Sequence, residues 1–87
     1  MALNVKFSPS AWSDFEYWTK QDRKTLKQIF KLINNTSKTP FEELGKPEPL
    51  KNEEGAWSRR IDDYNRLVYR VTENEIQIVS VRYHYEN

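Results

Sequence analysis

The sequence predicts an α+β fold in which a helix hairpin packs on one face of a small, mostly antiparallel sheet. The chain has 87 residues, a length that suits a single domain over residues 1–87 with one modest core. Aromatic residues make up 14% of it, and these large rings supply buried area that disordered chains lack. Apolar residues recur at helical spacing in the first half, whereas β-branched and aromatic residues fill the second half.

The first 21 residues predict a strand followed by a helix. Residues 3–7 alternate apolar and polar side chains, which is typical of a strand with one buried face. Ser8 can accept hydrogen bonds from the free amides of a helix N-terminus, and Pro9 fits the first helical position. We therefore expect a helix that begins here and ends near Lys20 or Gln21.

A second helix is predicted to begin after Asp22, a good N-cap, and to end near Asn34 and Asn35. Its apolar positions recur at intervals of three and four residues and form one stripe: Leu26, Ile29, Phe30 and Ile33. The roughly opposite side of this helix carries Lys24, Lys27 and Lys31. A row of lysines is usually a solvated surface, and the functional alternative is contact with a nucleic-acid backbone.

Residues 39–52 predict a loop, because they hold three of the four prolines. Glu48 lies between two of these prolines, which fix their own φ angles and stiffen the segment. A carboxylate on so stiff a segment can be held in place without secondary structure, although the usual case is a surface turn without a function. We expect Phe41 and Leu44 to anchor the loop to the core.

The last third of the chain predicts three strands joined by short connections, which makes them antiparallel neighbours. The predicted strands are residues 57–61, 66–72 and 76–83, and the turns are residues 53–55, 62–65 and 73–74. The last strand is apolar on both faces, so we expect it inside the sheet or with one face under the helices. The predicted order along the chain is β-α-α-β-β-β.

The register of the last hairpin decides which side chains share a face of the sheet. A two-residue loop pairs Arg66 with Val81 and places Arg66 and His84 on opposite faces. A three-residue loop with a bulge pairs Arg66 with Ser80, and then Ser80, Arg82 and His84 share its face. His84 could also lie beyond the end of the strand, and the sequence does not choose among these arrangements.

Arginine is concentrated in one part of the chain. Residues 57–85 hold five of the six arginines and the only histidine, and they contain no lysine. The planar guanidinium of arginine can bind a phosphate through two parallel hydrogen bonds, which the ammonium of lysine cannot do. The sequence therefore predicts a sheet that carries a phosphate-handling site.

Composition excludes several other classes of function. The chain has no cysteine, so it has no disulfide framework or thiol chemistry, and with one histidine it lacks a set of zinc ligands. The net charge of +1 predicts no partner by itself. No apolar run approaches the roughly 20 residues that span a bilayer, and nothing at the start resembles a signal peptide. We therefore expect a cytoplasmic protein that uses no metal or other cofactor.

Glutamate, arginine and histidine together can cleave RNA, which carries its own nucleophile in the 2′-hydroxyl. The reaction needs a base for that hydroxyl, positive charge on the phosphate and an acid for the departing 5′-oxygen. These three residue types can fill the three roles without a metal ion. Taken residue by residue the signal is weak, because a single histidine near a C-terminus and arginines on strands are common.

Four blocks of the sequence resemble the YoeB (Txe) family of bacterial toxins, within the RelE/ParE superfamily. In chain order these blocks are TPFEELGKPEPLK, WSRRI, NRLVYRV and RYHY. The resemblance implies the toxin of a type II toxin-antitoxin system, an mRNA interferase that cuts mRNA in the ribosomal A site. It also implies a cognate antitoxin that silences the toxin, and a small sheet with two helices. A homodimer remains open.

The resemblance also implies roles for individual residues. Glu48 would be the general base for the 2′-hydroxyl, Arg66 would stabilise the charge of the phosphorane, and His84 would be the general acid. Further positions would orient the substrate or contact RNA: Tyr85, Lys51 and Arg60. Asn65 departs from the family, because a histidine often stands there before the arginine.

Two rival functions remain at this stage. One is a relative of the same fold that poisons DNA gyrase by protein contact, and the combination of Glu48, Arg66, His84 and Tyr85 argues against it. The other is a noncatalytic module that binds RNA or the ribosome, for which the lysine row and exposed aromatic rings would suffice. Measuring whether mRNA is cut separates these functions.

Overall fold

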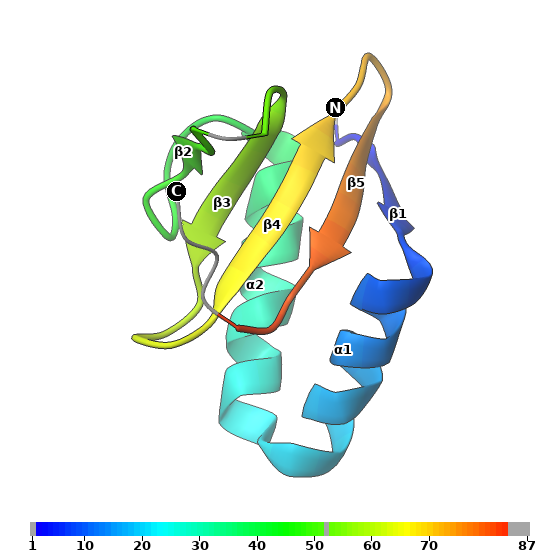
Figure 1. Cartoon of the computed structure of the whole chain (residues 1–87), viewed down its shortest axis with the longest axis vertical. Coiled ribbons are helices and arrows are strands. Elements are labelled where there is room, and N and C mark those ends of the chain that lie inside the picture. The colour runs from blue at the N-terminus through cyan, green and yellow to red at the C-terminus, as the bar shows by residue number, and fades with distance from the viewer. Residues whose placement is uncertain (1, 52, 84–87) are drawn as a thin grey trace.

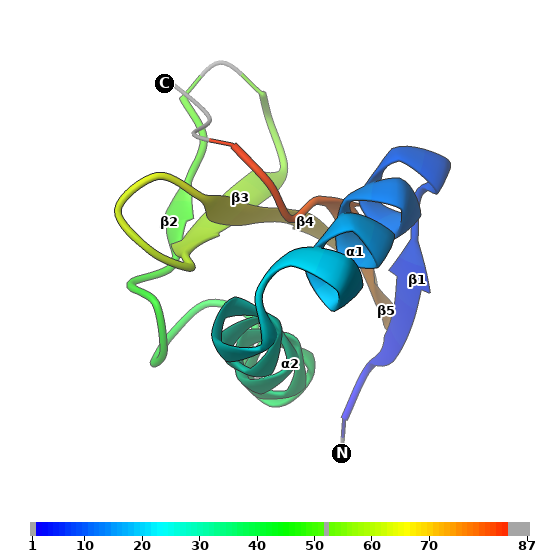
Figure 2. The same cartoon turned by 90° about the horizontal axis from the view of Figure 1, so that it is seen from below.

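The computed structural model describes residues 2–51 and 53–83. It shows two helices packed on one face of a five-stranded sheet (Figures 1 and 2). The elements are β1 (Asn4–Phe7), α1 (Pro9–Gln21), α2 (Arg23–Lys38), β2 (Glu48–Pro49), β3 (Ala56–Arg60), β4 (Arg66–Val71) and β5 (Glu75–Ser80). The predicted α+β class and the helix hairpin on one face are confirmed.

The strands are arranged in the order β1-β5-β4-β3-β2. β1 pairs with β5 in parallel, and the other three pairs are antiparallel. A parallel pair needs a crossover connection between its strands, and the helix hairpin is part of that connection, as Figure 1 shows. β5 therefore lies inside the sheet, as one of the two predicted alternatives had it.

The starts of both helices are formed as the sequence predicts. The Ser8 hydroxyl accepts a hydrogen bond from the Ala11 amide at 3.0 Å, and Pro9 is the first residue of α1. Asp22 caps α2, because its Oδ1 accepts from the Lys24 and Thr25 amides at 3.0 and 3.3 Å. Hydrogen bonds to this carboxylate, above all from Thr25, lower the pKa of Asp22.

The prediction that α2 ends near Asn34 and Asn35 is wrong, since the helix continues to Lys38. Thr36 is fully buried, and its hydroxyl donates to the Leu32 carbonyl at 2.7 Å, which satisfies it inside the helix. Asn35 lies within the helix, and its side-chain oxygen accepts a hydrogen bond from the Leu44 amide of the following loop at 3.2 Å.

The longer helix also changes which residues of α2 enter the core. Ile29 and Ile33 are buried as predicted, but Leu32 is fully buried and Phe30 is 50% exposed. The buried stripe follows the whole helix and includes Leu32 in place of Phe30. The exposed Phe30 ring makes an edge-to-face contact with Phe15 of α1, at 5.3 Å between ring centres.

The sheet has one face under the helices and one open face. Side chains of β4 and β5 alternate between these faces, and the main core lies on the helix side with Leu67, Tyr69, Ile76 and Ile78. A smaller cluster lies on the other face and consists of Leu50, Ala56 and Val68, with Val79 packed against it. Since Arg66 and Val68 are two residues apart on β4, they share this open face.

The hairpin between β4 and β5 follows one of the two predicted registers next to its turn and neither of them beyond a bulge. Val71 lies opposite Ile76 and Tyr69 opposite Ile78, which is the register of a two-residue loop. A bulge then shifts the register, so that Val68 lies opposite Ser80 and Val79 is the extra residue. The predicted pairings of Arg66 with Val81 or with Ser80 are therefore both wrong.

β5 ends at Ser80, earlier than predicted, and the chain leaves the sheet there. The Arg82 guanidinium packs on the Tyr17 ring of α1, 3.4 Å from its centre, so Arg82 does not share the open face with Arg66. His84 lies outside the described residues. Neither helix of the described chain has the length and apolar character that a bilayer-spanning segment requires.

Candidate functional site

Glu48 and Arg66 meet on the open face of the sheet. The Nη2 atom of Arg66 lies 2.9 Å from Oε1 of Glu48, and its Nε donates to the Ser58 hydroxyl at 3.1 Å. Glu48 pairs with Ser58 across the β2–β3 ladder, and β3 separates β2 from β4. The Arg66 side chain therefore reaches over β3 to the carboxylate on the next strand, and Ser58 holds it on the way.

The short strand β2 explains how Glu48 is presented. The predicted loop contains this two-residue strand at the edge of the sheet, where a proline at position 49 is tolerated because its missing amide faces no partner strand. The Leu50 amide donates to the Ala56 carbonyl at 2.9 Å, which continues the pairing with β3. The prediction of a loop is therefore wrong for Glu48 and Pro49, because the local proline content does not indicate whether a segment pairs with a distant strand.

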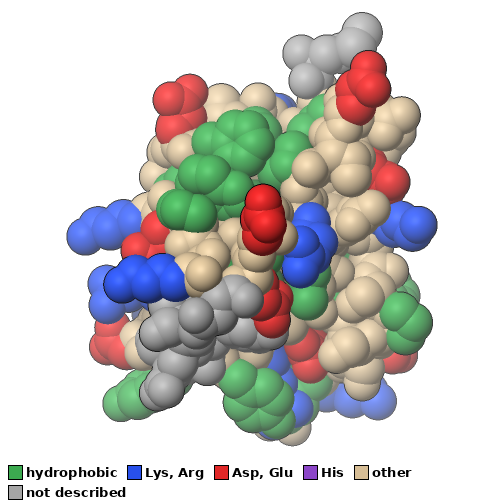
Figure 3. All heavy atoms as spheres, turned by 45° about the horizontal axis from the view of Figure 1, so that its top comes forward, with side chains coloured by type: hydrophobic (Ala, Val, Ile, Leu, Met, Phe, Trp, Pro, Cys, Tyr) green, Lys and Arg blue, Asp and Glu red, His purple; other side chains and the backbone are tan. Residues whose placement is uncertain are grey.

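A hollow of about 210 Å³ lies at this pair and is lined by Lys46, Glu48, Arg60 and Arg66. Three cationic side chains therefore surround one carboxylate, which suits a phosphate group close to a base. The Arg66 side chain is 15% exposed and Glu48 is 54% exposed, so the arginine is held by the sheet while the carboxylate remains free to move. Figure 3 shows that basic and acidic side chains lie side by side on the face of the molecule that it displays.

Two residues of this site were not predicted from the sequence. Ser58 is fully buried and orients Arg66. A single serine within a strand belongs to no sequence pattern that would predict such a contact. Lys46 lines the hollow next to Glu48, and its backbone adopts a left-handed φ of 50°. Its place directly before the Pro-Glu-Pro segment is the only signal that could have indicated its role.

A fully buried arginine anchors the loop that leads to Glu48. The Nη1 atom of Arg59 donates to Oδ1 of Asn35 at 2.6 Å and to the Leu44 carbonyl at 3.1 Å. Its Nη2 atom donates to the carbonyls of Thr39 and Glu42. The guanidinium therefore satisfies the backbone of residues 39–44, which would otherwise bury unpaired carbonyls.

This arginine replaces the apolar anchors that the sequence predicts for the loop. Phe41 and Leu44 are 52% and 36% exposed, so the prediction that they anchor the loop to the core is wrong. Phe41 instead packs on Trp57 at the surface, with 4.9 Å between the ring centres. Arg59 lies beneath the loop, and its hydrogen bonds to loop carbonyls hold the loop backbone in place of buried apolar side chains.

Tyr69 completes the contacts around Arg59. Its hydroxyl donates to the Pro40 carbonyl at 2.6 Å and accepts from Nε of Arg59 at 3.2 Å. Burial raises the pKa of Tyr69, and the neighbouring Arg59 guanidinium offsets part of this effect. The phenol is therefore held neutral and serves as a donor to the loop.

The three predicted lysines of α2 lie away from this hollow. Lys24, Lys27 and Lys31 are exposed on a helix that covers the opposite face of the sheet (Figure 2). Lys24 lines a separate hollow of about 410 Å³ with Thr25, Gln28, Ile61 and Asp62. This hollow is the larger of the two, but it contains neither Glu48 nor Arg66, so it is not the candidate site.

The remaining predicted residues are placed only in part. Arg60 lines the hollow of Glu48 and Arg66, whereas Lys51 is exposed in the segment after β2 and does not line it. His84 and Tyr85 lie outside the described residues. Within residues 2–51 and 53–83, no group of three His, Cys, Asp or Glu side chains could hold a metal ion.

Comparison with known proteins gives consistent matches over nearly the whole chain. The family described as the YoeB-like toxin of bacterial type II toxin-antitoxin systems matches residues 7–85. The toxin YoeB of Mycobacterium bovis is 51% identical over 83 residues, which cover 94% of this chain and 98% of that protein.

Solved structures match equally well. The YoeB dimer from Staphylococcus aureus is 44% identical, with a TM-score of 0.90, over 98% of this chain and 100% of that one. The heterotetrameric YoeB–YefM toxin-antitoxin complex from the same organism has a TM-score of 0.86 at 44% identity and covers the same shares of both chains. The fold and the order of the elements are therefore those of these toxins.

Proposed function

This chain belongs to the family of YoeB-like toxins of bacterial type II toxin-antitoxin systems, and we propose that it is an endoribonuclease that cleaves mRNA in the ribosomal A site. The observation that supports this proposal most directly is the contact between Glu48 and Arg66 inside a hollow lined by cations. Such a site offers a base next to a phosphate-binding group. Cleavage would stop translation in the cytoplasm, where the ribosomes are.

The proposed reaction uses the 2′-hydroxyl of the RNA as nucleophile. Glu48 takes the proton from this hydroxyl, the 2′-oxygen forms a bond to phosphorus, and the bond from phosphorus to the 5′-oxygen breaks. Arg66 stabilises the negative charge of the phosphorane. The departing 5′-oxygen takes a proton from the general acid, a role that the family resemblance gives to His84, while Tyr85 orients the substrate.

The ion pair of the free protein supports a simple activation step. A phosphate that binds to Arg66 competes with Glu48 for the same guanidinium. The Ser58 hydroxyl keeps Arg66 in place during this exchange, so the more exposed Glu48 is the side chain that moves. The carboxylate is then released next to the 2′-hydroxyl, where a base is needed.

The test is single-turnover cleavage of mRNA on saturating programmed ribosomes, comparing variants with the parent protein. Arg66→Ala removes charge stabilisation, so we expect a rate loss of about 10²–10³, by analogy with oxyanion donors. Glu48→Ala and His84→Ala each remove a proton-transfer group, which typically contributes about 10²–10⁴-fold.

Arg70→Ala is the matched control for Arg66→Ala. Arg70 lies on the same strand and face, but it contacts Glu53 and the Glu54 carbonyl and does not line the hollow. We expect this variant to cleave at the parental rate. Parental rates for the Glu48, Arg66 and His84 variants alike would refute the site and favour a noncatalytic ribosome-binding module.

We further propose that a cognate antitoxin silences this surface. The YoeB toxin of Staphylococcus aureus has been solved both as a dimer and in a heterotetrameric complex with YefM. A partner segment rich in carboxylates would pair with Arg60 and Arg66 and fill the hollow. The antitoxin complex should therefore cleave no mRNA, and cleavage at the full rate by the complex would contradict this part of the proposal.

A further inference from the structure

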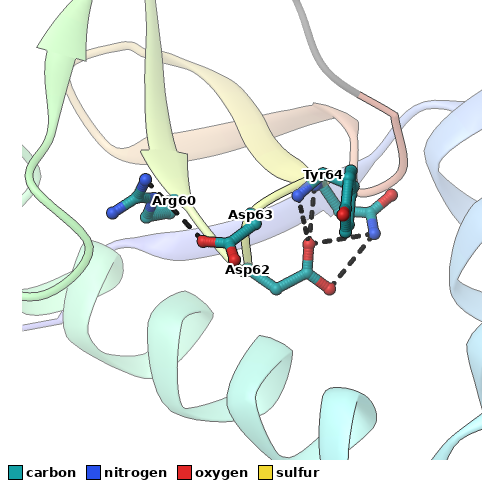
Figure 4. Close-up of polar contacts among 5 residues, drawn as sticks. Arg60, Asp62, Asp63 and Tyr64 are labelled. Atoms are coloured by element: carbon teal, nitrogen blue, oxygen red, sulfur yellow. Dashed lines mark hydrogen bonds and ion pairs between the residues drawn. The ribbon is translucent and has the colours of Figure 1, made fainter.

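The turn between β3 and β4 is tied to the segment that leaves β5. Within this turn, Oδ1 of Asp62 accepts hydrogen bonds from the amides of Tyr64 and Asn65 at 2.8 and 2.7 Å. The Nδ2 atom of Asn65 lies 3.1 and 3.2 Å from the two oxygens of the same carboxylate. Figure 4 shows Asp62 pointing into the turn toward these donors.

The other end of the Asn65 amide faces a different part of the chain. Its Oδ1 accepts a hydrogen bond from the Tyr83 amide at 2.8 Å. The side chain of Asn65 can satisfy both neighbours in one orientation only, because its oxygen must face an N–H and its NH₂ a carboxylate. Asp62 therefore fixes the orientation in which Asn65 can hold Tyr83.

Tyr83 is held at the residue where the chain makes an unusual bend. Its φ of 72° lies in the left-handed region, which is rare for a bulky residue and is retained only where the surroundings enforce it. Its carbonyl accepts from the Arg66 amide at 3.0 Å, so both of its backbone groups contact the start of β4. Two residues earlier, Trp18 and Asp14 of α1 hold the carbonyl and amide of Val81.

We propose that Asn65, oriented by Asp62, is a positioning residue that fixes the chain around Tyr83 against Arg66. This inference rests on the proposed function, since the residue after Tyr83 in the sequence is His84, the proposed general acid. Asn65 does not line the hollow. Its expected effect is on how the described chain up to Tyr83 is held against Arg66, and so on the cleavage step, not on substrate binding.

The exposed ion pair in the same turn does not share this role. Arg60 and Asp63 are 3.9 Å apart with side chains 56% and 83% exposed, and Figure 4 shows them directed away from the Asp62 contacts. Exposed pairs of this kind contribute little to structure. The turn is therefore fixed by Asp62 and Asn65.

The test compares a single substitution at Asn65 with a double variant in which the side chains of Asp62 and Asn65 are exchanged. Asn65→Asp places a second carboxylate against Asp62, so we expect the single-turnover cleavage rate on saturating ribosomes to fall about tenfold, a change of the size that one lost charged hydrogen bond produces. The ribosome concentration for half-saturation should stay within about twofold of the parent value. The double variant D62N/N65D again provides one amide and one carboxylate, and it should recover most of the rate.

A second measurement does not depend on cleavage. Amide hydrogen exchange at Tyr83 should accelerate in Asn65→Asp and return toward the parent rate in the double variant, while exchange at Leu67 in the core stays unchanged. Asn74→Asp, in the exposed β4–β5 turn, is the control for adding one carboxylate and should change neither readout.

The outcomes separate this inference from the proposed function. A parent protein that cuts no mRNA refutes the proposed function, and the exchange rates then decide alone whether Asn65 holds Tyr83. Unchanged exchange at Tyr83 in Asn65→Asp overturns the inference. Faster exchange at Tyr83 with cleavage at the parental rate, or a double variant no better than Asn65→Asp, overturns the positioning role.

Discussion

Ser58 shows how one buried hydroxyl can set the geometry of an exposed site. It is fully buried on β3 and accepts a hydrogen bond from Nε of Arg66. Without this acceptor the guanidinium would have only Glu48 as a side-chain partner among the described residues, and it would follow that carboxylate when it moves. The orientation of the arginine toward a phosphate therefore depends on Ser58.

We predict that Ser58→Ala lowers the single-turnover cleavage rate by roughly 10- to 100-fold, since a hydrogen bond to a charged group is worth about 1.5–3 kcal/mol. Ser58→Thr keeps the hydroxyl and should retain most of the rate. The measurement is cleavage on saturating ribosomes, with the variants checked for parental thermal stability. An alanine variant as fast as the parent would show that the sheet alone orients Arg66.

Tyr69 predicts a pH dependence of stability. Its pKa is raised in the folded protein by burial, so above the unfolded value of about 10 the folded state keeps a proton that the unfolded chain releases. The native state then binds more protons than the unfolded state, and the free energy of unfolding falls as pH rises through this range. Below about pH 10 the contribution is fully present.

Tyr69→Phe should remove this alkaline loss of stability, as measured by urea unfolding at several pH values. At neutral pH the variant should be less stable by about 1 kcal/mol, because it no longer donates to the Pro40 carbonyl. Tyr64→Phe is the control, since Tyr64 is 77% exposed and should leave the pH profile unchanged. An equally steep alkaline fall in Tyr69→Phe would exclude Tyr69 as its source.

At the scale of elements, the sequence predicts those parts of the fold that local chemistry determines. Ser8 and Asp22 indicate helix starts because each cap bonds to amides two or three residues away. The turn at residues 73–74 is local as well, and it agrees with the register of the β4–β5 hairpin beside it. These elements need no knowledge of distant contacts.

The wrong predictions share a different origin, which is contact between distant residues. Nothing in the sequence distinguishes Arg59 from the other arginines of residues 57–85, yet it is buried under a loop that lies 15–20 residues earlier in the chain. Its guanidinium contacts Asn35 in α2 and the carbonyls of Thr39, Glu42 and Leu44 in the loop. Sequence periodicity cannot reveal an arginine whose acceptors are backbone carbonyls.

The family resemblance names Glu48 and Arg66 as site residues, and this assignment stays a prediction. The structure places the two side chains 2.9 Å apart. Reasoning from the residues alone left their relative position open, since it depends on pairing of β2, β3 and β4 across the sheet. Ser58 and Lys46 went unnoticed for the same reason.

The lysines of α2 give a prediction at the same scale. If Lys24, Lys27 and Lys31 contact phosphates of ribosomal RNA, their joint replacement by glutamine should weaken ribosome binding. The slope of log affinity against log salt should fall by up to about 2, since each contact to a single strand contributes about 0.7. Cleavage by the bound protein should stay near the parental rate.

Lys6, Lys20 and Lys38 are also exposed, so their joint replacement by glutamine controls for the loss of the same charge elsewhere. The control should leave the salt dependence closer to that of the parent. Equal effects of the two triple variants would mean that only net charge matters, and the lysine row would then be an ordinary solvated surface.

At the scale of the whole molecule, one face of the sheet carries the main core and the other face carries the candidate site. The helices and the main core occupy one face, while the hollow with Glu48 and Arg66 lies on the other. Substitutions in the core should therefore change stability first, and substitutions in the hollow should change activity with little effect on stability. The buried Arg59 is the link between them, because it supports the loop that carries Glu48.

The chemistry proposed for the open face predicts that cleavage survives removal of trace metals. Side chains would supply both proton transfers and the charge stabilisation, so chelator-treated protein should cleave at the parental rate. Ribosomes need magnesium, so the protein alone should be treated and then added to intact particles in metal-depleted buffer that retains magnesium. Activity lost on treatment and restored by one added transition metal would overturn this mechanism.

The bulge at Val79 has a consequence for how this toxin can vary in evolution. Ile76 and Ile78 reach the core two positions apart, but the next buried residue of this segment, Val81, comes three positions later. The packing of this segment thus depends on the number of its residues as well as on their identities. Loss of one of the two residues at the bulge would restore regular alternation between Ile78 and Val81, whereas loss of a residue from the regular part of β5 would turn its side chains to the opposite face of the sheet. We therefore expect natural variants that differ in length within this strand to do so at the bulge.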